Sequence, residues 1–160
     1  MEASMRALSF IAVVLVSAGC SDAPGIVAEC SGGAESEPCR VFALVNEERA
    51  RAGVPAYRYD AQLAIAAQRH AVDMADNGYF SHDSLDGRTF VDRANEAGYD
   101  GSPRGENIAR GQTSPEQVMT SWMGSEGHRA NILSSGSNEI GVGFHQNLWV
   151  QVFGRGSEEP

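Results

Sequence analysis

Histidine and carboxylate side chains gather in three short stretches of the sequence, and these residue types can bind a metal ion or activate water. The stretches are YFSHD around His82, RGENIA around Glu106, and SEGHRANIL, which contains Glu126 and His128. Neutral imidazole and carboxylate suit zinc, and a site with two histidines leaves positions open for water or a ligand. A nearby carboxylate can orient a histidine. The alternative interpretation is that these groups only tie helix ends to a sheet through hydrogen bonds.

The other histidines of the chain are not expected to form a second chemical site. His70 is predicted to be a surface or hydrogen-bonded residue of a helix, and His145 is predicted to face solvent from a strand. Ser81, His82 and Asp83 spell the letters of a catalytic triad, but adjacent residues cannot form its relay. The sequence contains no His-Glu-x-x-His helix, no Gly-x-Ser-x-Gly elbow and no phosphate loop.

Apolar spacing and boundary signals predict four helices around these stretches. They are expected to begin near Val41 and directly after Asp60, Thr89 and Ser114. Asp60 and Ser114 are typical N-cap residues, and Thr89 pairs with Asp92 as a capping box. These helices supply the scaffold that must bring the three polar stretches together.

The stretch around His128 is expected to interrupt a helix. Gly124 and Gly127 flank a Ser-Glu pair, and glycine costs a helix interior about 1 kcal/mol relative to alanine. We therefore predict that His128 opens a short helical turn. The two glycines would let its side chain turn inward toward His82 and Glu106.

The strands come mostly late in the chain. ENIARG, residues 106–111, is predicted to be a short strand after a loop rich in Gly, Pro and Ser, and residues 139–154 read as an antiparallel hairpin that turns at Gln146 and Asn147. Trp122 and Trp149 are expected in the core. Helices that surround a small sheet indicate the α+β class.

The first 20 residues have the composition of an export signal. An apolar run over residues 7–16 follows an arginine; it is shorter than the ~20 residues that span a bilayer and fits a signal peptide. SAGC at residues 17–20 resembles a bacterial lipobox, which predicts lipidation of Cys20; a soluble secreted protein is the alternative. Residues 21–38 are expected to form a flexible tether, followed by one globular domain over residues 39–156.

Cysteine count and charge narrow the possible partners. The chain has three cysteines, and an odd number in an exported protein requires an explanation. If Cys20 carries lipid, Cys30 and Cys39 could close a disulfide, with free thiols as the alternative. The net charge of −9, with no basic cluster, disfavours nucleic acids and anionic lipid surfaces. Membrane association is thus expected only through an N-terminal lipid anchor.

Six stretches in order resemble the bacterial branch of the CAP superfamily, which includes cysteine-rich secretory, antigen 5 and pathogenesis-related proteins. They are LVNEERARAG, AAQRHAVDMADNGYFSH, DRANEAGY, GENIARG, SWMGSEGHRANIL and IGVGFHQNLWVQVFG, within residues 41–154. The resemblance implies a three-layer α-β-α sandwich with a small, mainly antiparallel sheet. It also implies a cavity lined by His82, Glu106 and His128. Glu126, which stands where bacterial members often have proline, is left open as a fourth member.

Two functions are consistent with this reading. The resemblance favours an extracytoplasmic binding or interaction module, with an envelope, lipid or protein ligand and with zinc or another divalent cation held by His82 and His128. The alternative is a metal-dependent hydrolase, a peptidase or cell-envelope-cleaving enzyme, in which a glutamate and metal-bound water do the chemistry. The lack of a dedicated nucleophile favours the binding module, and no catalytic residue is assigned.

Overall fold

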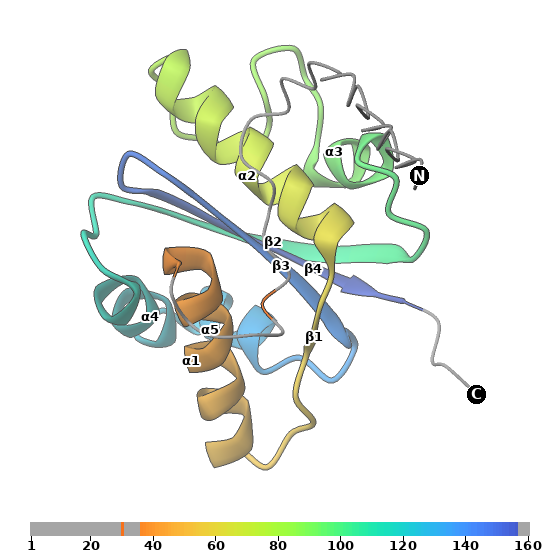
Figure 1. Cartoon of the computed structure of the whole chain (residues 1–160), viewed down its shortest axis with the longest axis vertical. Helices are drawn as coiled ribbons and strands as arrows, with labels where there is room; N and C mark the ends of the chain where they lie inside the picture. Colours follow the sequence, from red (N-terminus) through yellow and green to blue (C-terminus); the bar gives the residue numbers. More distant parts are fainter. Residues whose placement is uncertain (1–29, 31–35, 157–160) are drawn as a thin grey trace, which may run out of the picture.

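A computed structural model describes Cys30 and residues 36–156 of the chain (Figure 1). The predicted export signal over residues 1–20, the lipidation site Cys20 and most of the predicted tether lie outside the described residues. Within the described residues, no helix is long and apolar enough to cross a membrane.

The centre of the fold is a four-stranded sheet in the order β1-β3-β4-β2. Its strands are β1 (Arg58–Tyr59), β2 (Ser102–Arg110), β3 (Glu139–His145) and β4 (Leu148–Arg155). β3 and β4 form the predicted hairpin, in which Gln146 and Asn147 have φ values of 46° and 61°; such left-handed residues suit a two-residue hairpin turn. β2 pairs antiparallel with β4 and β1 pairs parallel with β3, so the sheet is mainly antiparallel.

Among the described residues, five helices cover the sheet on both faces, which confirms the predicted three-layer α-β-α sandwich (Figure 1). They are α1 (Glu37–Arg51), α2 (Ala61–Asp76), α3 (Phe90–Glu96), α4 (Pro115–Met123) and α5 (Glu126–Ile132). β4 shows why two layers are needed, because successive side chains point to opposite faces of a strand. Trp149 and Phe153 pack with α1, α4 and α5, whereas Val150 and Val152 pack with α2.

The capping signals in the sequence set the helix starts. The Asp60 and Ser114 side chains accept hydrogen bonds from the backbone N–H groups of Leu63 and Gln117. Thr89 and Asp92 form the predicted capping box at the start of α3. Both predicted core tryptophans are buried.

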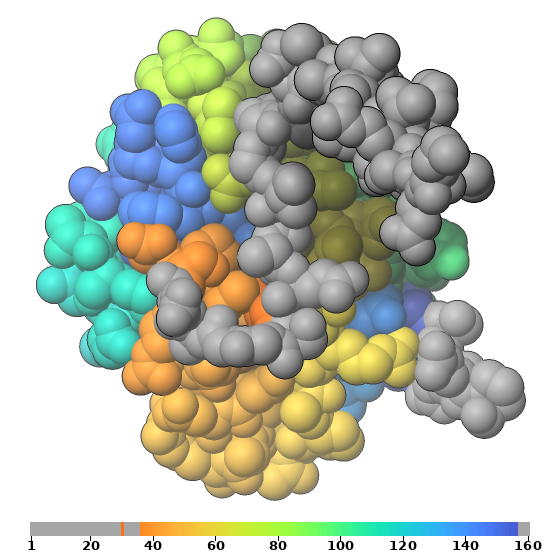
Figure 2. All heavy atoms as spheres, in the orientation of Figure 1, coloured from red at the N-terminus to blue at the C-terminus, as the bar shows by residue number. Residues whose placement is uncertain are grey.

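Figure 2 shows α1 (orange) beside α4 (teal). A 2.8 Å ion pair from Arg40 to Glu116 joins these two helices.

α2 lies directly on the hairpin because β3 carries glycine at the points of contact. A Cβ atom on Gly141 would come within 2.0 Å of the Ala64 backbone nitrogen, and one on Gly143 within 2.4 Å of the Ala67 carbonyl carbon. The alanine-rich face of α2 therefore approaches the sheet at backbone distance. This close packing fixes the first half of α2 against β3.

The structure corrects three sequence predictions. β2 begins at Ser102, not at Glu106, because residues 102–105 pair with the end of β4 despite their loop-like composition. Proline is tolerated there because β2 is an edge strand. The short strand β1 was not predicted, since two residues leave no periodic signal. α1 begins at Glu37, inside the segment predicted as tether, with Ser36 as its N-cap.

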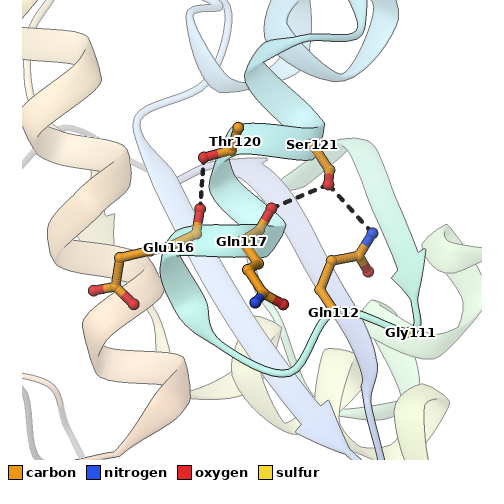
Figure 3. Close-up of a pocket in the computed structure, with 6 residues that line it drawn as sticks. All are labelled: Gly111, Gln112, Glu116, Gln117, Thr120 and Ser121. Carbon is orange, nitrogen blue, oxygen red and sulfur yellow. Dashed lines mark hydrogen bonds between the residues drawn. The ribbon is translucent and has the colours of Figure 1, made fainter.

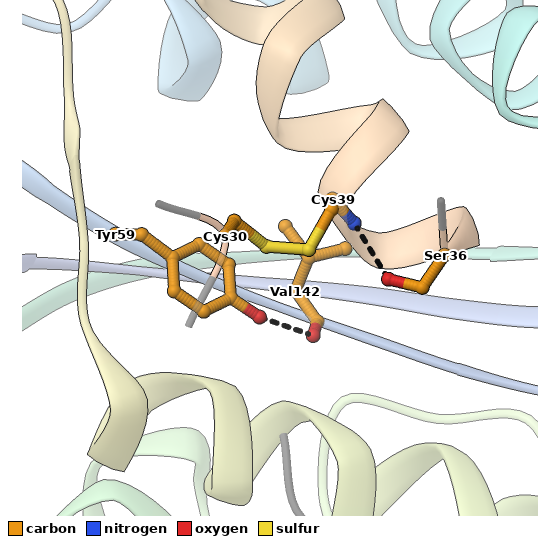
Figure 4. Close-up of a disulfide and its surroundings, with 5 residues drawn as sticks. All are labelled: Cys30, Ser36, Cys39, Tyr59 and Val142. Atoms are coloured by element: carbon orange, nitrogen blue, oxygen red, sulfur yellow. Dashed lines mark hydrogen bonds between the residues drawn. A yellow bond between two sulfur atoms is a disulfide. The ribbon is translucent and has the colours of Figure 1, made fainter. Parts of the chain in front are cut away.

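A disulfide joins Cys30 to the first turn of α1 at Cys39 (Figure 4). Figure 4 also shows Tyr59 and Val142 beside the bridge, with the Tyr59 hydroxyl donating to the Val142 carbonyl oxygen at 3.5 Å. The bridge ties Cys30 to α1.

Candidate functional site

Glu106 is the buried centre of the candidate site. It lies on the edge strand β2, and its side chain is only 1% exposed. Its carboxylate accepts one hydrogen bond from Arg93 Nη2 at 2.6 Å and one from His82 Nδ1 at 2.9 Å. Both carboxylate oxygens therefore have a charged or chargeable partner.

Arg93 of α3 fixes the loop that carries His82. Besides its bond to Glu106, the buried guanidinium donates to the carbonyl oxygens of His82 at 2.9 Å and Arg88 at 3.0 Å, and to the Ser84 hydroxyl at 3.1 Å. One buried side chain thus closes residues 82–88 against the end of the sheet. The predicted site omitted Arg93; the DRANEAGY stretch that contributes to the family resemblance was the available signal.

His82 is the exposed part of the site. Its side chain is 56% exposed, whereas its carboxylate partner Glu106 is buried. A carboxylate accepts hydrogen bonds, so Nδ1 of the imidazole carries the proton and Nε2 is the ring nitrogen that remains for a ligand. The hydrogen bond to Glu106 raises the pKa of His82 above its ordinary value of 6.5. This is the arrangement of a carboxylate that orients a histidine ligand.

His128 lies on the other side of β2, in the first turns of α5, and is half-buried. Burial lowers the pKa of its imidazole, and the positive charge of His82 lowers that pKa further. The His128 backbone carbonyl oxygen accepts a 3.1 Å hydrogen bond from Asn107 Nδ2.

The predicted role of the glycines near His128 was wrong. The chain does break between α4 and α5, but His128 is the third residue of α5 and Gly127 lies inside that helix. Gly124 has a helical φ of −76°, and a Cβ atom on Gly127 would meet nothing within 4 Å. His128 is placed by the contacts of α5, not by glycine flexibility.

A buried amide network makes those contacts. Asn107 is fully buried and donates to Gln151 Oε1 at 3.0 Å as well as to the His128 carbonyl. Asn131 of α5 donates back to Asn107 Oδ1 at 2.9 Å. Arg49, from α1, donates to the Ile132 carbonyl oxygen at 2.7 Å, at the end of α5. α5 is thus held at both its middle and its end.

Glu126, the possible fourth member, is exposed in the first turn of α5. No hydrogen bond or ion pair between described residues connects it to His82, Glu106 or His128. Among the described residues, no three His, Cys, Asp or Glu side chains converge closely enough to hold a metal ion. The protein therefore offers two imidazoles here, with Glu106 behind them.

The two remaining histidines differ. His70 of α2 is hydrogen-bonded, which confirms one of the two alternatives predicted for it, but it is fully buried and not on the surface. His145 is half-buried beside Gln146 at the hairpin turn. His70 interacts electrostatically with Glu106 and Arg93, so it belongs to the surroundings of the site.

A separate open hollow of about 460 Å³ lies beside α4 (Figure 3). It is lined by polar side chains and one glycine: Gly111, Gln112, Glu116, Gln117, Thr120 and Ser121. Figure 3 shows the Ser121 hydroxyl between two of these residues: it donates to the Gln117 backbone carbonyl oxygen at 3.0 Å and accepts from Gln112 Nε2 at 3.3 Å. None of the predicted site residues lines it.

The arrangement around β2 holds the exposed imidazole of His82 and the half-buried imidazole of His128 near a buried ion pair between Arg93 and Glu106. We call His82, Glu106 and His128 the histidine site. A buried ion pair is costly to maintain and is weak evidence for stability. Perturbed, partly exposed titratable groups fixed by such a pair are more typical of functional sites.

Comparison with known proteins agrees with this fold. The profile of the cysteine-rich secretory protein family (CAP) matches residues 42–153. The Bacillus subtilis (strain 168) protein YkwD is 39% identical over 116 residues, which are 71% of this chain and 45% of that protein. The membrane protein YlbC of the same organism is 33% identical over 114 residues, 71% of this chain and 33% of that protein. The chain thus spans less than half the length of these relatives.

Solved structures give the same result. The crystal structure of an extracellular protein containing an SCP domain, from Bacillus anthracis str. Ames, has a TM-score of 0.71 and 37% identity, and covers 73% of this chain and 39% of its own. An outer surface protein from Borrelia burgdorferi has a TM-score of 0.64 at 22% identity, and covers 73% of this chain and 90% of its own. The second likeness supports the fold alone.

Proposed function

Because the chain belongs to the cysteine-rich secretory protein (CAP) family, we propose that it is an extracytoplasmic binding module that uses the histidine site to hold its ligand. A relative of solved structure is described as extracellular, and the disulfide between Cys30 and Cys39 suits an oxidising compartment. Attachment to the membrane through a lipid on Cys20 is part of the same proposal.

The observation that carries the proposal is the contrast between Glu106 and His82. A carboxylate that is 1% exposed bonds to an imidazole that is 56% exposed. A purely structural ion pair between Arg93 and Glu106 would not need a surface histidine at its end. The contact keeps the proton of the neutral His82 imidazole on Nδ1. Nε2 then carries no proton and is the ring nitrogen available to a ligand.

Zinc or a similar divalent cation fits this donor set. Neutral imidazoles of His82 and His128 are suitable ligands, and Glu106 suits the role of orienting His82 from behind because both of its oxygens are already engaged. When bound, the ion would supply a Lewis-acidic centre with open positions for an oxygen or nitrogen of the partner. The partner itself would be a cell-envelope, lipid or protein ligand.

The hydrolase alternative has less support. A metal hydrolase needs a carboxylate or similar group that is free to take a proton from water. Glu106 is tied to Arg93 at 2.6 Å and to His82 at 2.9 Å. Glu126 is exposed and has no described contact with the histidine site. A binding role uses the observed contacts without rearranging them.

Calorimetric titration of zinc into chelator-treated protein tests this proposal. We expect micromolar or tighter binding to the unaltered chain, with strong weakening in His82→Ala and in His128→Ala. His145→Ala is the matched control, because it removes an imidazole at the hairpin turn, which lies beside the end of β2 at Arg110 and not beside Glu106. Equal binding by all four proteins, or no binding by any, would rule out a cation at the histidine site.

A further inference from the structure

His70 is a fully buried histidine of α2 that the proposed binding role does not use. Its Nε2 lies 2.9 Å from the carbonyl oxygen of Ser81. A carbonyl only accepts, so Nε2 carries the proton and donates it. Its other ring nitrogen, Nδ1, is buried and has no hydrogen-bond partner among the described residues.

Packing alone does not explain a histidine at this position. A buried acceptor without a partner destabilises the folded protein, and an apolar side chain would fill the same space without that cost. Gln68, one half-turn earlier on α2, shows the contrast. Its side chain both donates to the Phe144 carbonyl at 3.0 Å and accepts from the Phe144 N–H at 2.9 Å. His70 therefore contributes its single donor at the expense of stability.

That donor acts on the residue before His82. The Ser81 carbonyl is held by His70 from α2, and the His82 carbonyl is held by Arg93 from α3 at 2.9 Å. Two successive peptide groups are thus fixed by two buried side chains from different helices. Burial lowers the pKa of His70 and favours its neutral form, which keeps one tautomer donating to Ser81.

We propose that His70 is a positioning residue for the histidine site: by holding the Ser81 carbonyl it sets the orientation of the His82 side chain. The imidazole then meets Glu106 with Nδ1 and presents Nε2 outward. This inference rests on the proposed binding role only for its consequence on ligand affinity. The geometric part, the effect of His70 on the bond between His82 and Glu106, is independent of any ligand.

Two substitutions separate the donor from the bulk of the ring. His70→Leu keeps an apolar volume and removes the donor. His70→Gln keeps a donor, because its terminal amide nitrogen reaches the place of the histidine Nε2. Proton NMR of the zinc-free full chain detects the Nδ1–H of His82 as a downfield signal, since a hydrogen bond to a buried carboxylate slows its exchange. Thermal unfolding of each variant reports whether the fold is intact.

We expect His70→Leu to lose the His82 Nδ1–H signal and to bind zinc about tenfold or more weakly, the usual cost of disturbing a group behind a metal ligand. His70→Gln should restore both. An intact His82 signal in folded His70→Leu would overturn the inference. If the leucine variant does not fold, His70→Asn replaces it: its shorter amide cannot reach Ser81, so equal signals in the Asn and Gln variants would also overturn it.

The same experiment separates this inference from the proposed function. Loss of the His82 signal in His70→Leu, together with no zinc binding by the unaltered chain, would support the positioning role and remove the cation. Zinc binding that is equal in the unaltered chain and in a His70→Leu variant with an unchanged His82 signal would keep the cation and remove the positioning role.

Discussion

Glu106 and Asn107 are neighbours on β2, and their side chains hold the two histidine segments from opposite faces of the sheet. Glu106 accepts the bond from His82 Nδ1 at 2.9 Å on the side of α2 and α3. Asn107 donates to the His128 carbonyl at 3.1 Å on the side of α5. Because consecutive strand residues alternate between faces, two adjacent positions suffice to bring both layers to one edge.

Both histidine segments are held by a strand at the edge of the sheet. β2 pairs only with β4, so its other edge is not covered by a strand among the described residues. The loop between α2 and α3 contacts β2 through the bond from His82 to Glu106, and α5 contacts it through the bond from Asn107 to the His128 carbonyl. A site on an inner strand would have been enclosed by its neighbours.

The charge on Glu106 is needed to balance buried Arg93, and this gives a stability prediction. Glu106→Gln should lower the free energy of unfolding by about 3 kcal/mol or more, because it leaves a buried guanidinium without its counter-charge. Urea denaturation measures the change. Glu126→Gln is the matched control: the same substitution on an exposed side chain should change stability by less than about 0.5 kcal/mol. Equal losses in both variants would contradict the assigned role of the ion pair.

The histidines of the site should titrate on opposite sides of 6.5, their ordinary pKa. The bond to Glu106 raises the pKa of His82, whereas burial lowers that of His128. The stability that His82 contributes is therefore complete below pH 6.5, its unfolded value, and is lost as the pH rises through its folded pKa. His128 acts in the opposite sense: its folded pKa lies below 6.5, so stability falls as the pH drops from 6.5 to that folded pKa, where the unfolded chain takes up the proton more readily than the folded protein.

NMR titration of the imidazole carbon-bound protons checks these directions. We expect the His82 midpoint above 6.5 and the His128 midpoint below it. In Glu106→Gln the His82 midpoint should fall, and in Glu126→Gln it should stay where it was. A His82 midpoint that does not respond to Glu106→Gln would show that the carboxylate does not hold the imidazole in solution.

Much of the fold could be predicted because its signals are local. Asp60, Thr89 and Ser114 each cap the helix that follows them, and Gln146 and Asn147 turn the hairpin. β2 was predicted too short because its first residues gain their strand conformation from pairing with β4, across about fifty positions of the sequence. Such long-range pairing overrides local composition.

Some residues of the candidate site could likewise be predicted from local sequence, whereas others are recognised only in the folded structure. His82, Glu106 and His128 were found because each stands in a stretch that resembles the family pattern. Arg93 and His70 were missed as partners, since an arginine in a short helix and a histidine in an alanine-rich one normally face solvent. Their burial follows from the packing of α2 and α3 against the sheet, which is visible only in three dimensions.

A substitution of Asn107 should disturb the His128 side of the site and leave the bond between His82 and Glu106 intact. Asn107→Leu removes both donors of the buried amide and leaves the His128 carbonyl and Gln151 Oε1 without them. We expect a loss of about 2–6 kcal/mol in unfolding free energy, since each of these two buried groups without a partner costs about 1–3 kcal/mol. Zinc binding should weaken through His128, while the Nδ1–H signal of His82 persists.

Asn77→Ala serves as the control for Asn107→Leu. Asn77 donates to Asp73 at the exposed end of α2, so its removal should leave zinc binding unchanged. Hydrogen exchange of the α5 amides provides a second measurement. The exchange should be faster in Asn107→Leu and unchanged in Asn77→Ala. If that variant lost the His82 signal as well, the two faces of β2 would not act independently.

Gly127 is the position where the sequence hypothesis and the structure make opposite predictions. If glycine flexibility turned His128 inward, Gly127→Ala would disturb the histidine site. In the structure Gly127 lies inside α5, where an added methyl group would meet nothing within 4 Å, and alanine favours a helix over glycine by about 1 kcal/mol. We therefore expect Gly127→Ala to unfold at equal or higher urea concentration and to bind zinc unchanged.

Gly143→Ala is the contrasting case for the same substitution. Its Cβ atom would come within 2.4 Å of the α2 backbone at Ala67, where a helix main chain cannot yield as a flexible side chain can. This variant should lose several kcal/mol of unfolding free energy or fail to fold.

The outcome that would contradict the prediction for Gly127 is weaker zinc binding by folded Gly127→Ala. It would support the glycine hypothesis, because the substitution reduces the freedom of the backbone before His128.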